Sequence, residues 1–369
     1  MAINKVTSKH LLVFFDDFHA YQKALPLILV FQSPTFVLTI HDKNTPAVLR
    51  LASMTPVSPP PITHPFSAAM TFAKTPALLL LFLLCLLGHI PIVHAAEPTA
   101  PALKVEVTGS GRPMILIPGL ACGGNVWDGT VAHFKDTFQC HVVTLPGFAG
   151  QPTPGEPFLQ QVGDLLSAYI RDQKLDHPII VGHSLGGFLG FWMAIEHPDQ
   201  VGPIIAVDGV PYYPALLNPA ATPKEQQASA AQFRDGIKSQ STTLFAFRNA
   251  FILATMITDG KNLQMVAEQS NKSDPATVGQ AFYELMTTDL REKTATIRSP
   301  VLLLAATDLN ASAEARQKQE TNYTAQVANI PNHRIAFAPK SRHFIQLDAP
   351  DFFFQQVDSF LKEISSHQK

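Results

Sequence analysis

The chain has 369 residues, of which 46% are hydrophobic and 15% are charged, and its formal net charge is −2. This length is sufficient for one large domain or two ordinary ones. The near balance of 27 basic and 29 acidic residues gives no electrostatic case for nucleic acid, which normally demands a basic face, so no nucleic-acid partner is expected. The composition is that of a globular protein with a substantial core.

An apolar run at residues 77–88 lies well inside the chain and is shorter than the roughly 20 residues needed to span a bilayer. Met70 and Lys74 precede it, and the small residues Val93 and Ala95 follow it at cleavage-type positions. This pattern predicts a signal peptide over residues 70–95 and a secreted or periplasmic protein. The alternative is an uncleaved anchor, and membrane contact is then expected only through residues 77–92.

Residues 1–69 fit this interpretation poorly, because a signal peptide belongs at the amino terminus. They contain a Pro-rich stretch at 56–61 and show no clear helical or strand period. We interpret them as a poorly ordered extension and, if translation begins at Met70, as an artefact of the gene model. A cytoplasmic tail ahead of an anchor is the alternative. On the first interpretation a single domain covers residues 96–369.

From residue 104 onward, short apolar runs alternate with stretches of helical period, such as 158–175 and 188–197. This alternation predicts an α/β fold with a mostly parallel central sheet flanked by helices. The segment of about residues 210–298 has a helical pattern and is too long for a loop. We therefore expect a helical cap inserted between the sixth and seventh strands. Strands are expected at residues 104–107, 114–117, 140–145, 178–181, 203–207, 301–305 and 334–337.

The segment 182–186 reads Gly-His-Ser-Leu-Gly and directly follows the apolar run 178–181. A G-x-S-x-G segment between a strand and a helix is a nucleophile elbow, a turn so tight that larger neighbours of the serine would clash. It projects the hydroxyl at the carboxyl edge of the sheet, beside a helix N-terminus whose amides stabilise an anion. We therefore predict that Ser184 is a catalytic nucleophile.

A serine hydroxyl needs a base to take its proton, and His343 is the best candidate by position. It follows the expected strand 334–337 and a short polar loop. His333 lies at the opposite end of that strand and should be remote from the serine. His183 is adjacent to Ser184, but adjacent side chains in a tight turn diverge, so we interpret it as a packing residue.

The base needs an acid to fix its tautomer and stabilise the imidazolium. Asp308, after the expected strand 301–305, is the preferred acid. Asp208 is a competitor, because the strand before it also ends near the serine. The backbone N–H groups of Leu120 and Leu185 are expected to form the oxyanion hole, since the glycines around Leu120 let the backbone approach a reacting carbonyl.

These segments resemble the α/β-hydrolase family, especially its esterase, lipase, haloperoxidase and aminopeptidase members with a helical cap. The resemblance runs from about residue 103 to 361 and rests on segments 117–120, 182–186, 306–308 and 343–344 with Pro350. The order Ser184, Asp308, His343 is the one that the resemblance implies.

Three features depart from the family pattern. Pro118 stands where many relatives have His, and Thr-Leu-Pro-Gly at 144–147 replaces a turn that commonly begins with an acidic residue. Arg342 precedes the base where Gly is usual. None of these departures removes a member of the triad.

The resemblance implies a serine hydrolase that cleaves carboxylic esters through an acyl-enzyme, with a small-molecule ester or amide as its partner. An amidase or aminopeptidase and an acyltransferase would use the same triad, and a non-catalytic binding protein on this scaffold is a further alternative. No cofactor is implied, and no metal is expected, because no His, Cys, Asp or Glu cluster has ligand spacing.

Two further groups of residues lead to expectations. Cys122 and Cys140 fall about 15 Å apart in the expected sheet, whereas a disulfide needs Cα atoms within about 7 Å, so no bridge is expected. Aromatic residues of the cap could line an apolar acyl pocket or form the core of the cap itself. They are Phe233, Phe245, Phe247, Phe251, Phe282 and Tyr283.

Overall fold

The computed structural model describes residues 27–32, 35–42, 45–50, 102–307 and 312–366. The chain divides into two compact units, Met1–Ile92 and Val93–Lys369. In the first unit, β1 (Leu27–Gln32), β2 (Thr35–Asp42) and β3 (Thr45–Arg50) pair antiparallel in sequence order. The sequence led us to expect no regular structure there. Its Thr, Val and Ile residues at 35–40 are, however, typical of strands.

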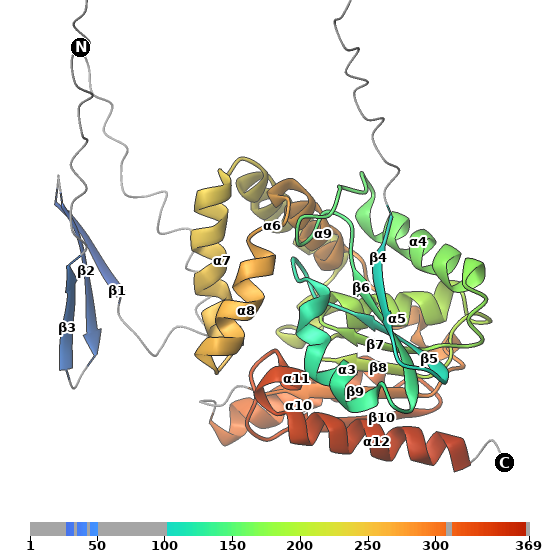
Figure 1. Cartoon of the computed structure of the whole chain (residues 1–369). Coiled ribbons are helices and arrows are strands. Elements are labelled where there is room, and N and C mark those ends of the chain that lie inside the picture. Colours follow the sequence, from blue (N-terminus) through green and yellow to red (C-terminus); the bar gives the residue numbers. More distant parts are fainter. Residues whose placement is uncertain (1–26, 33–34, 43–44, 51–101, 308–311, 367–369) are drawn as a thin grey trace, which may run out of the picture. The chain divides into compact units, whose positions relative to one another are not determined.

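Within its described residues, the second unit contains one seven-stranded sheet of order β10-β9-β8-β7-β5-β6-β4 (Figure 1). All neighbouring pairs are parallel except β4 and β6. The expected α/β class with a mostly parallel sheet is therefore confirmed. The strands are β4 (Lys104–Thr108), β5 (Arg112–Ile117), β6 (Phe138–Thr144), β7 (Ile179–His183), β8 (Ile204–Val207), β9 (Val301–Ala306) and β10 (His333–Ala338).

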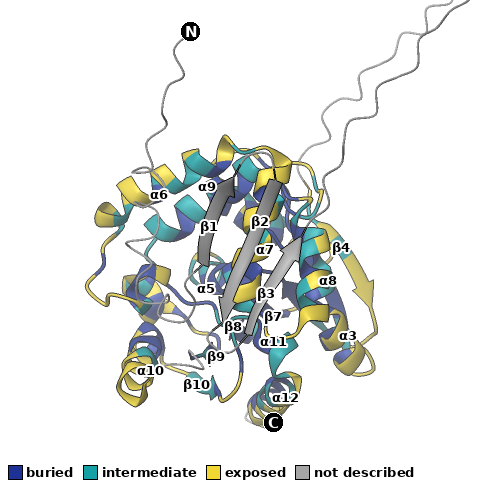
Figure 2. Ribbon diagram, turned by 90° about the vertical axis from the view of Figure 1, so that its left-hand side faces the viewer, coloured by how far each residue is buried: buried dark blue, intermediate teal, exposed yellow. Residues whose placement is uncertain are grey.

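Strands β8 and β9 are apolar along their whole length, as expected where both faces of a sheet are covered (Figure 2). Successive side chains of a strand point to opposite faces. Met114 and Leu116 of β5 accordingly join one hydrophobic cluster, whereas Ile115 and Ile117 join the other. The sheet thus separates two cores.

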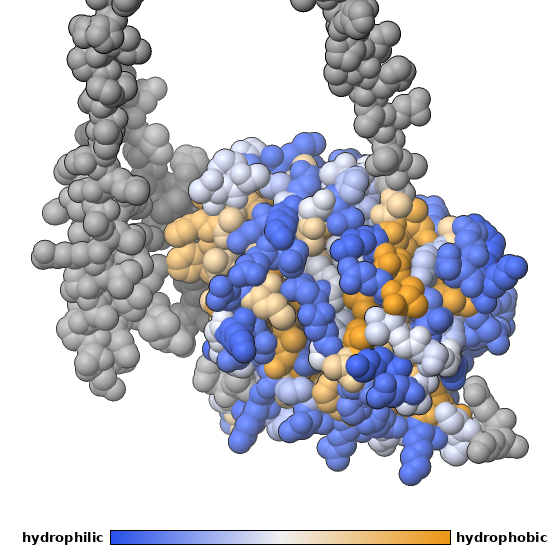
Figure 3. Space-filling view, in the orientation of Figure 1, coloured by the Kyte–Doolittle hydropathy of each residue, from blue (hydrophilic) through white to orange (hydrophobic). Residues whose placement is uncertain are grey.

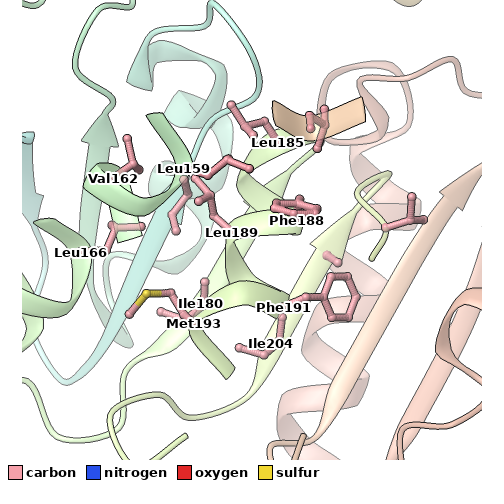
Figure 4. Packing of buried hydrophobic residues seen from close by; sticks show 14 of the residues in the cluster. Leu159, Val162, Leu166, Ile180, Leu185, Phe188, Leu189, Phe191, Met193 and Ile204 are labelled. Carbon is pink, nitrogen blue, oxygen red and sulfur yellow. The ribbon is translucent and has the colours of Figure 1, made fainter. Parts of the chain in front are cut away.

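The first core lies under α4 (Phe158–Asp172), α5 (Leu185–Glu196) and α10 (Ala313–Val327). Figure 4 shows side chains of α4 and α5 meeting over Ile180 and Ile204 of the sheet. The second core lies under α3 (Asp128–Phe134) and α12 (Pro350–Ser366).

Four helices form the expected insertion: α6 (Pro223–Lys238), α7 (Thr242–Met256), α8 (Gly260–Ser270) and α9 (Pro275–Thr287). Each begins after a residue whose side-chain oxygen accepts a hydrogen bond from the first turn. These residues are Thr222, Ser241, Asp259 and Asp274.

The position of this insertion in the strand order differs from the one expected. It lies between β8 and β9, which are the fifth and sixth strands of the described sheet. The expected place between a sixth and a seventh strand is not confirmed, because five described strands of this sheet precede the insertion along the chain. Among the described residues, the structure contains no helix that is both long and apolar enough to cross a membrane.

Candidate active site

Ser184 stands at a sharp turn between β7 and α5, with φ 53° and ψ −115°. A non-glycine residue at positive φ is strained, and here the surroundings hold it. The Ser184 N–H donates to the Val207 carbonyl over 2.9 Å. A Cβ on Gly182 would overlap the Gly186 backbone, and one on Gly186 would overlap the Ile117 carbonyl. The elbow therefore needs both glycines.

The turn after the neighbouring strand β8 packs directly on this elbow. Asp208 has φ 50°, and its N–H donates to the Leu304 carbonyl over 2.7 Å. A Cβ on the next residue, Gly209, would overlap the carbonyl oxygen of Ser184. The Asp-Gly pair thus lets the carboxylate side chain leave the sheet next to the serine.

His343 follows β10, and its Nδ1 lies 2.6 Å from Oδ2 of Asp208. The Asp208 side chain is only 7% exposed, and that of His343 is 22% exposed. A charge-assisted hydrogen bond of this length in a largely buried place is strong. It fixes the proton of the neutral imidazole on Nδ1 and leaves Nε2 as the acceptor.

The other carboxylate oxygen of Asp208 accepts two further hydrogen bonds. The Ala306 N–H donates to Oδ1 over 2.9 Å, and the hydroxyl of Tyr323 on α10 donates to it over 2.7 Å. These donors turn Oδ2 toward the histidine. The sequence preference for Asp308 as the acid falls on a residue outside those described. The described partner of His343 is the competitor, Asp208.

His183 is buried behind the elbow, as expected for a packing residue. Its Nε2 donates to the carbonyl oxygen of His343 over 3.1 Å, and the two ring centroids lie 4.6 Å apart. Burial, and then the nearby His343, lower the pKa of His183 well below its usual value. A His183 ring held neutral with its proton on Nε2 supports the loop that carries His343. His333, at the start of β10, bonds instead to the Ile330 carbonyl.

The loop after β5 approaches the same turn. A Cβ on Gly119 would lie 3.2 Å from the Ser184 Cβ, so the backbone leading into Leu120 runs beside Ser184. The cap residue Ser273 holds this loop through its hydroxyl, which donates to the Ala121 carbonyl over 3.0 Å. Leu185 is the first residue of α5, where backbone N–H groups have no partner within the helix.

The cap aromatics fall into distinct groups. Phe245 is buried in the first core, and Phe233 packs on Phe282 with ring centroids 4.4 Å apart. Phe247 and Phe251 of α7 are 62% and 50% exposed. Figure 3 shows a hydrophobic patch over α7 at the left of the domain. Its exposed residues are Leu244, Phe247, Phe251 and Ile252.

Two sets of side chains have no evident part in this site. Cys122 and Cys140 are free and buried, and burial raises their pKa values to about 12 and about 11. Such thiols are unreactive, because the thiolate is the nucleophile. Among the described residues, no three His, Cys, Asp or Glu side chains lie together in a way that could hold a metal ion.

The residues that orient Asp208 are not predictable from the sequence around it. Tyr323 lies in the middle of α10, and no local motif marks it. The one available signal was the Asp208-Gly209 pair directly after a buried strand. A glycine in that place indicates a close approach of two backbone segments.

Comparison with known proteins gives consistent matches. The sequence pattern of the family described as "alpha/beta hydrolase fold" matches residues 112–350. The chain is 23% identical over 278 residues to the pimeloyl-[acyl-carrier protein] methyl ester esterase of Nitrosomonas europaea, which covers 70% of this chain and 99% of that protein. The enzyme of the same name from Legionella pneumophila is 24% identical over 263 residues, with coverage of 70% and 99%.

Two solved structures illustrate the similarity of fold. A thermophilic esterase from Thermogutta terrifontis has a TM-score of 0.59 and 18% identity, covering 71% of this chain and 93% of that one. MenH from S. aureus has a TM-score of 0.59 and 17% identity, covering 71% and 98%. At these identities the likeness concerns the fold.

Proposed function

Because this chain belongs to the α/β-hydrolase fold family, we propose that it hydrolyses carboxylic esters through an acyl-enzyme on Ser184. The expected family and ester-hydrolase class are confirmed by the family match and by relatives that are named esterases. The proposed active site rests mainly on one observation, the 2.6 Å hydrogen bond between His343 and Asp208. It lies beside an elbow that holds Ser184 at positive φ.

In the proposed reaction, Nε2 of His343 accepts the hydroxyl proton of Ser184 while the oxygen attacks the ester carbonyl. Asp208 stabilises the imidazolium that results. The N–H groups of Leu120 and Leu185 stabilise the oxyanion, and His343 then returns its proton to the departing alcohol. Water attacks the acyl-enzyme in a second step that uses the same groups.

The substrate that we propose is an ester of an acyl chain that reaches the cap. The relatives carry the name of an esterase for pimeloyl-[acyl-carrier protein] methyl ester, which is an acyl methyl ester. The exposed apolar residues of α7 provide surface for an acyl chain. An ester with a small alcohol and a medium acyl chain is therefore the first substrate to test.

A chain-length series of p-nitrophenyl esters, assayed beside aminoacyl anilides, tests this function. We expect ester turnover to exceed anilide turnover, and Ser184→Ala to abolish both turnover and labelling by a fluorophosphonate probe. Ser167→Ala, a change of a buried serine on α4, is the matched control. Labelling that persists in the Ser184→Ala protein would contradict the assignment of the nucleophile.

We also propose that residues 70–95 direct export of the chain, with cleavage near Ala96. The support for this is the short apolar run 77–88 with Lys74 before it and small residues after it. Amino-terminal sequencing of protein purified from its source tests the proposal. A start near Ala96 supports it, whereas a start at Met1 contradicts it.

A further inference from the structure

Arg342, which the sequence marked as a departure from the family, joins the end of cap helix α7 to the loop of the candidate base. Its Nη1 donates to the Ala254 carbonyl over 2.8 Å and to the Ile257 carbonyl over 3.0 Å. The last carbonyls of a helix have no partner within the helix, and cations are favourable there. A guanidinium, always protonated and rich in donors, suits this position.

The residue on the other side of His343 bonds to the same helix end. The Phe344 N–H donates to the Met256 carbonyl over 3.4 Å. Phe344 and Ile257 also belong to the same buried hydrophobic cluster. Both chain neighbours of His343 are therefore attached to the last turn of α7.

Asp348 closes the connection. Its Oδ2 accepts from the Arg342 N–H over 2.9 Å. Its Oδ1 accepts from the N–H and the hydroxyl of Thr258, over 2.9 and 2.8 Å. Thr258 is the second residue after the end of α7. One carboxylate thus holds the base loop and the exit from α7 at once.

From these contacts we propose that Arg342 is a positioning residue, which fixes the His343 loop against α7 so that the cap helix holds the base in place. This inference rests on the proposed function of the site. Asp208 orients the His343 ring and His183 holds its carbonyl. Arg342 adds the third anchor, which of these three is the one that attaches the loop to the cap. A displacement of α7 would therefore move the base.

The test compares Arg342→Gln and Arg342→Lys with Arg334→Gln. Arg334 is a matched control, because it also donates to a backbone carbonyl, that of Gln356, but on α12 and away from the cap. We expect Arg342→Gln to lower kcat about 10- to 100-fold, since a misplacement of about 1 Å can cost that much, and to leave KM within about twofold. Arg342→Lys should recover part of the loss, because an ammonium can still donate to one carbonyl.

Fluorophosphonate labelling of Ser184 should slow by the same factor as kcat, because it uses the same base. A wild-type kcat in Arg342→Gln, a loss confined to KM, or an equal loss in Arg334→Gln would overturn the proposal.

Hydrogen exchange separates this proposal from the function on which it rests. Wild-type protein without ester turnover or Ser184 labelling would contradict the proposed function alone. The amides of the last turn of α7 and of residues 341–348 should still exchange faster in Arg342→Gln than in Arg334→Gln. Unchanged exchange at both segments would overturn the positioning role, whether or not the enzyme is active.

Discussion

The carboxylate of Asp208 has both oxygens engaged, and this decides what an amide would do in its place. Ala306 and Tyr323 present two donors to Oδ1, while Oδ2 faces Nδ1 of His343. In Asp208→Asn the amide oxygen would turn toward the two donors. Its NH₂ group would then face Nδ1 and stabilise the tautomer that carries the proton on Nε2. That tautomer cannot accept the serine proton.

We accordingly predict that Asp208→Asn lowers kcat by roughly 10⁴-fold with little change in folding. Asp308→Asn is the paired variant and should change kcat by less than about threefold, on the assignment of the tautomer-fixing role to Asp208. Steady-state kinetics on one p-nitrophenyl ester measures both. A larger loss of kcat in Asp308→Asn than in Asp208→Asn would instead assign the role of the acid to Asp308, as the sequence favoured.

His183 gives a prediction for stability against pH. Its pKa is lowered in the folded protein, whereas a histidine in the unfolded chain titrates near about 6.5. Below that pH the unfolded chain binds a proton that the folded protein does not, so His183 costs stability as the pH falls. The slope for one such group is about 1.36 kcal/mol per pH unit.

Replacing His183 by Gln should remove this contribution and keep a donor toward the His343 carbonyl. The unfolding free energy, measured by urea titration between pH 6.5 and 5, should then fall less steeply than in the wild type. His141, whose pKa burial also lowers, is present in both proteins, so its effect cancels. Parallel curves for the two proteins would contradict the prediction.

At the scale of elements, a buried carboxylate of the cap accepts hydrogen bonds at the N-terminus of a core helix, α4. Glu284 of α9 is 9% exposed and accepts from the N–H groups of Phe158 and Leu159, over 2.7 and 2.8 Å. The preceding residue, Pro157, supplies no side-chain cap to α4. A negative charge at a helix N-terminus is favourable, so Glu284 replaces the missing cap.

We predict that Glu284→Ala lowers the unfolding free energy by about 2 to 4 kcal/mol, because two buried N–H groups lose their acceptor. Chemical denaturation measures the change. Glu292→Ala, at an exposed position, should stay within about 0.5 kcal/mol of the wild type. An equally small effect at Glu284 would show that water replaces the carboxylate.

Elements with a local signal could be predicted, and those defined by distant partners could not. The expected strand 301–305 and the elbow at 182–186 match β9 and the turn after β7, because burial and tight turns restrict the residues allowed there. The choice between Asp208 and Asp308 had no such signal. Both follow strands that end at one edge of the sheet, and the donor Tyr323 lies 115 residues away from Asp208 along the chain.

At the scale of the whole molecule, the buried cysteines Cys122 and Cys140 lie in different parts of the second unit. Cys140 lies in β6, which pairs with β5 on one side and β4 on the other. Cys122 lies in the loop after β5, and the cap residue Ser273 holds the adjacent Ala121 carbonyl. Opening of the cap would expose Cys122 without breaking the sheet, because loops open at lower free energy than central strands.

We therefore predict that a thiol reagent labels native Cys122 about tenfold faster than Cys140, which corresponds to an opening free energy lower by about 1.4 kcal/mol. The raised pKa values, about 12 and about 11, suppress reaction of both thiols in the closed protein, so labelling reports opening. The measurement uses a Cys85→Ser protein and mass spectrometry of each site. The Cys122 rate should also depend more weakly on urea, because a local opening exposes less surface than global unfolding. Equal rates with equal urea dependence would instead show that cap and sheet open as one cooperative unit.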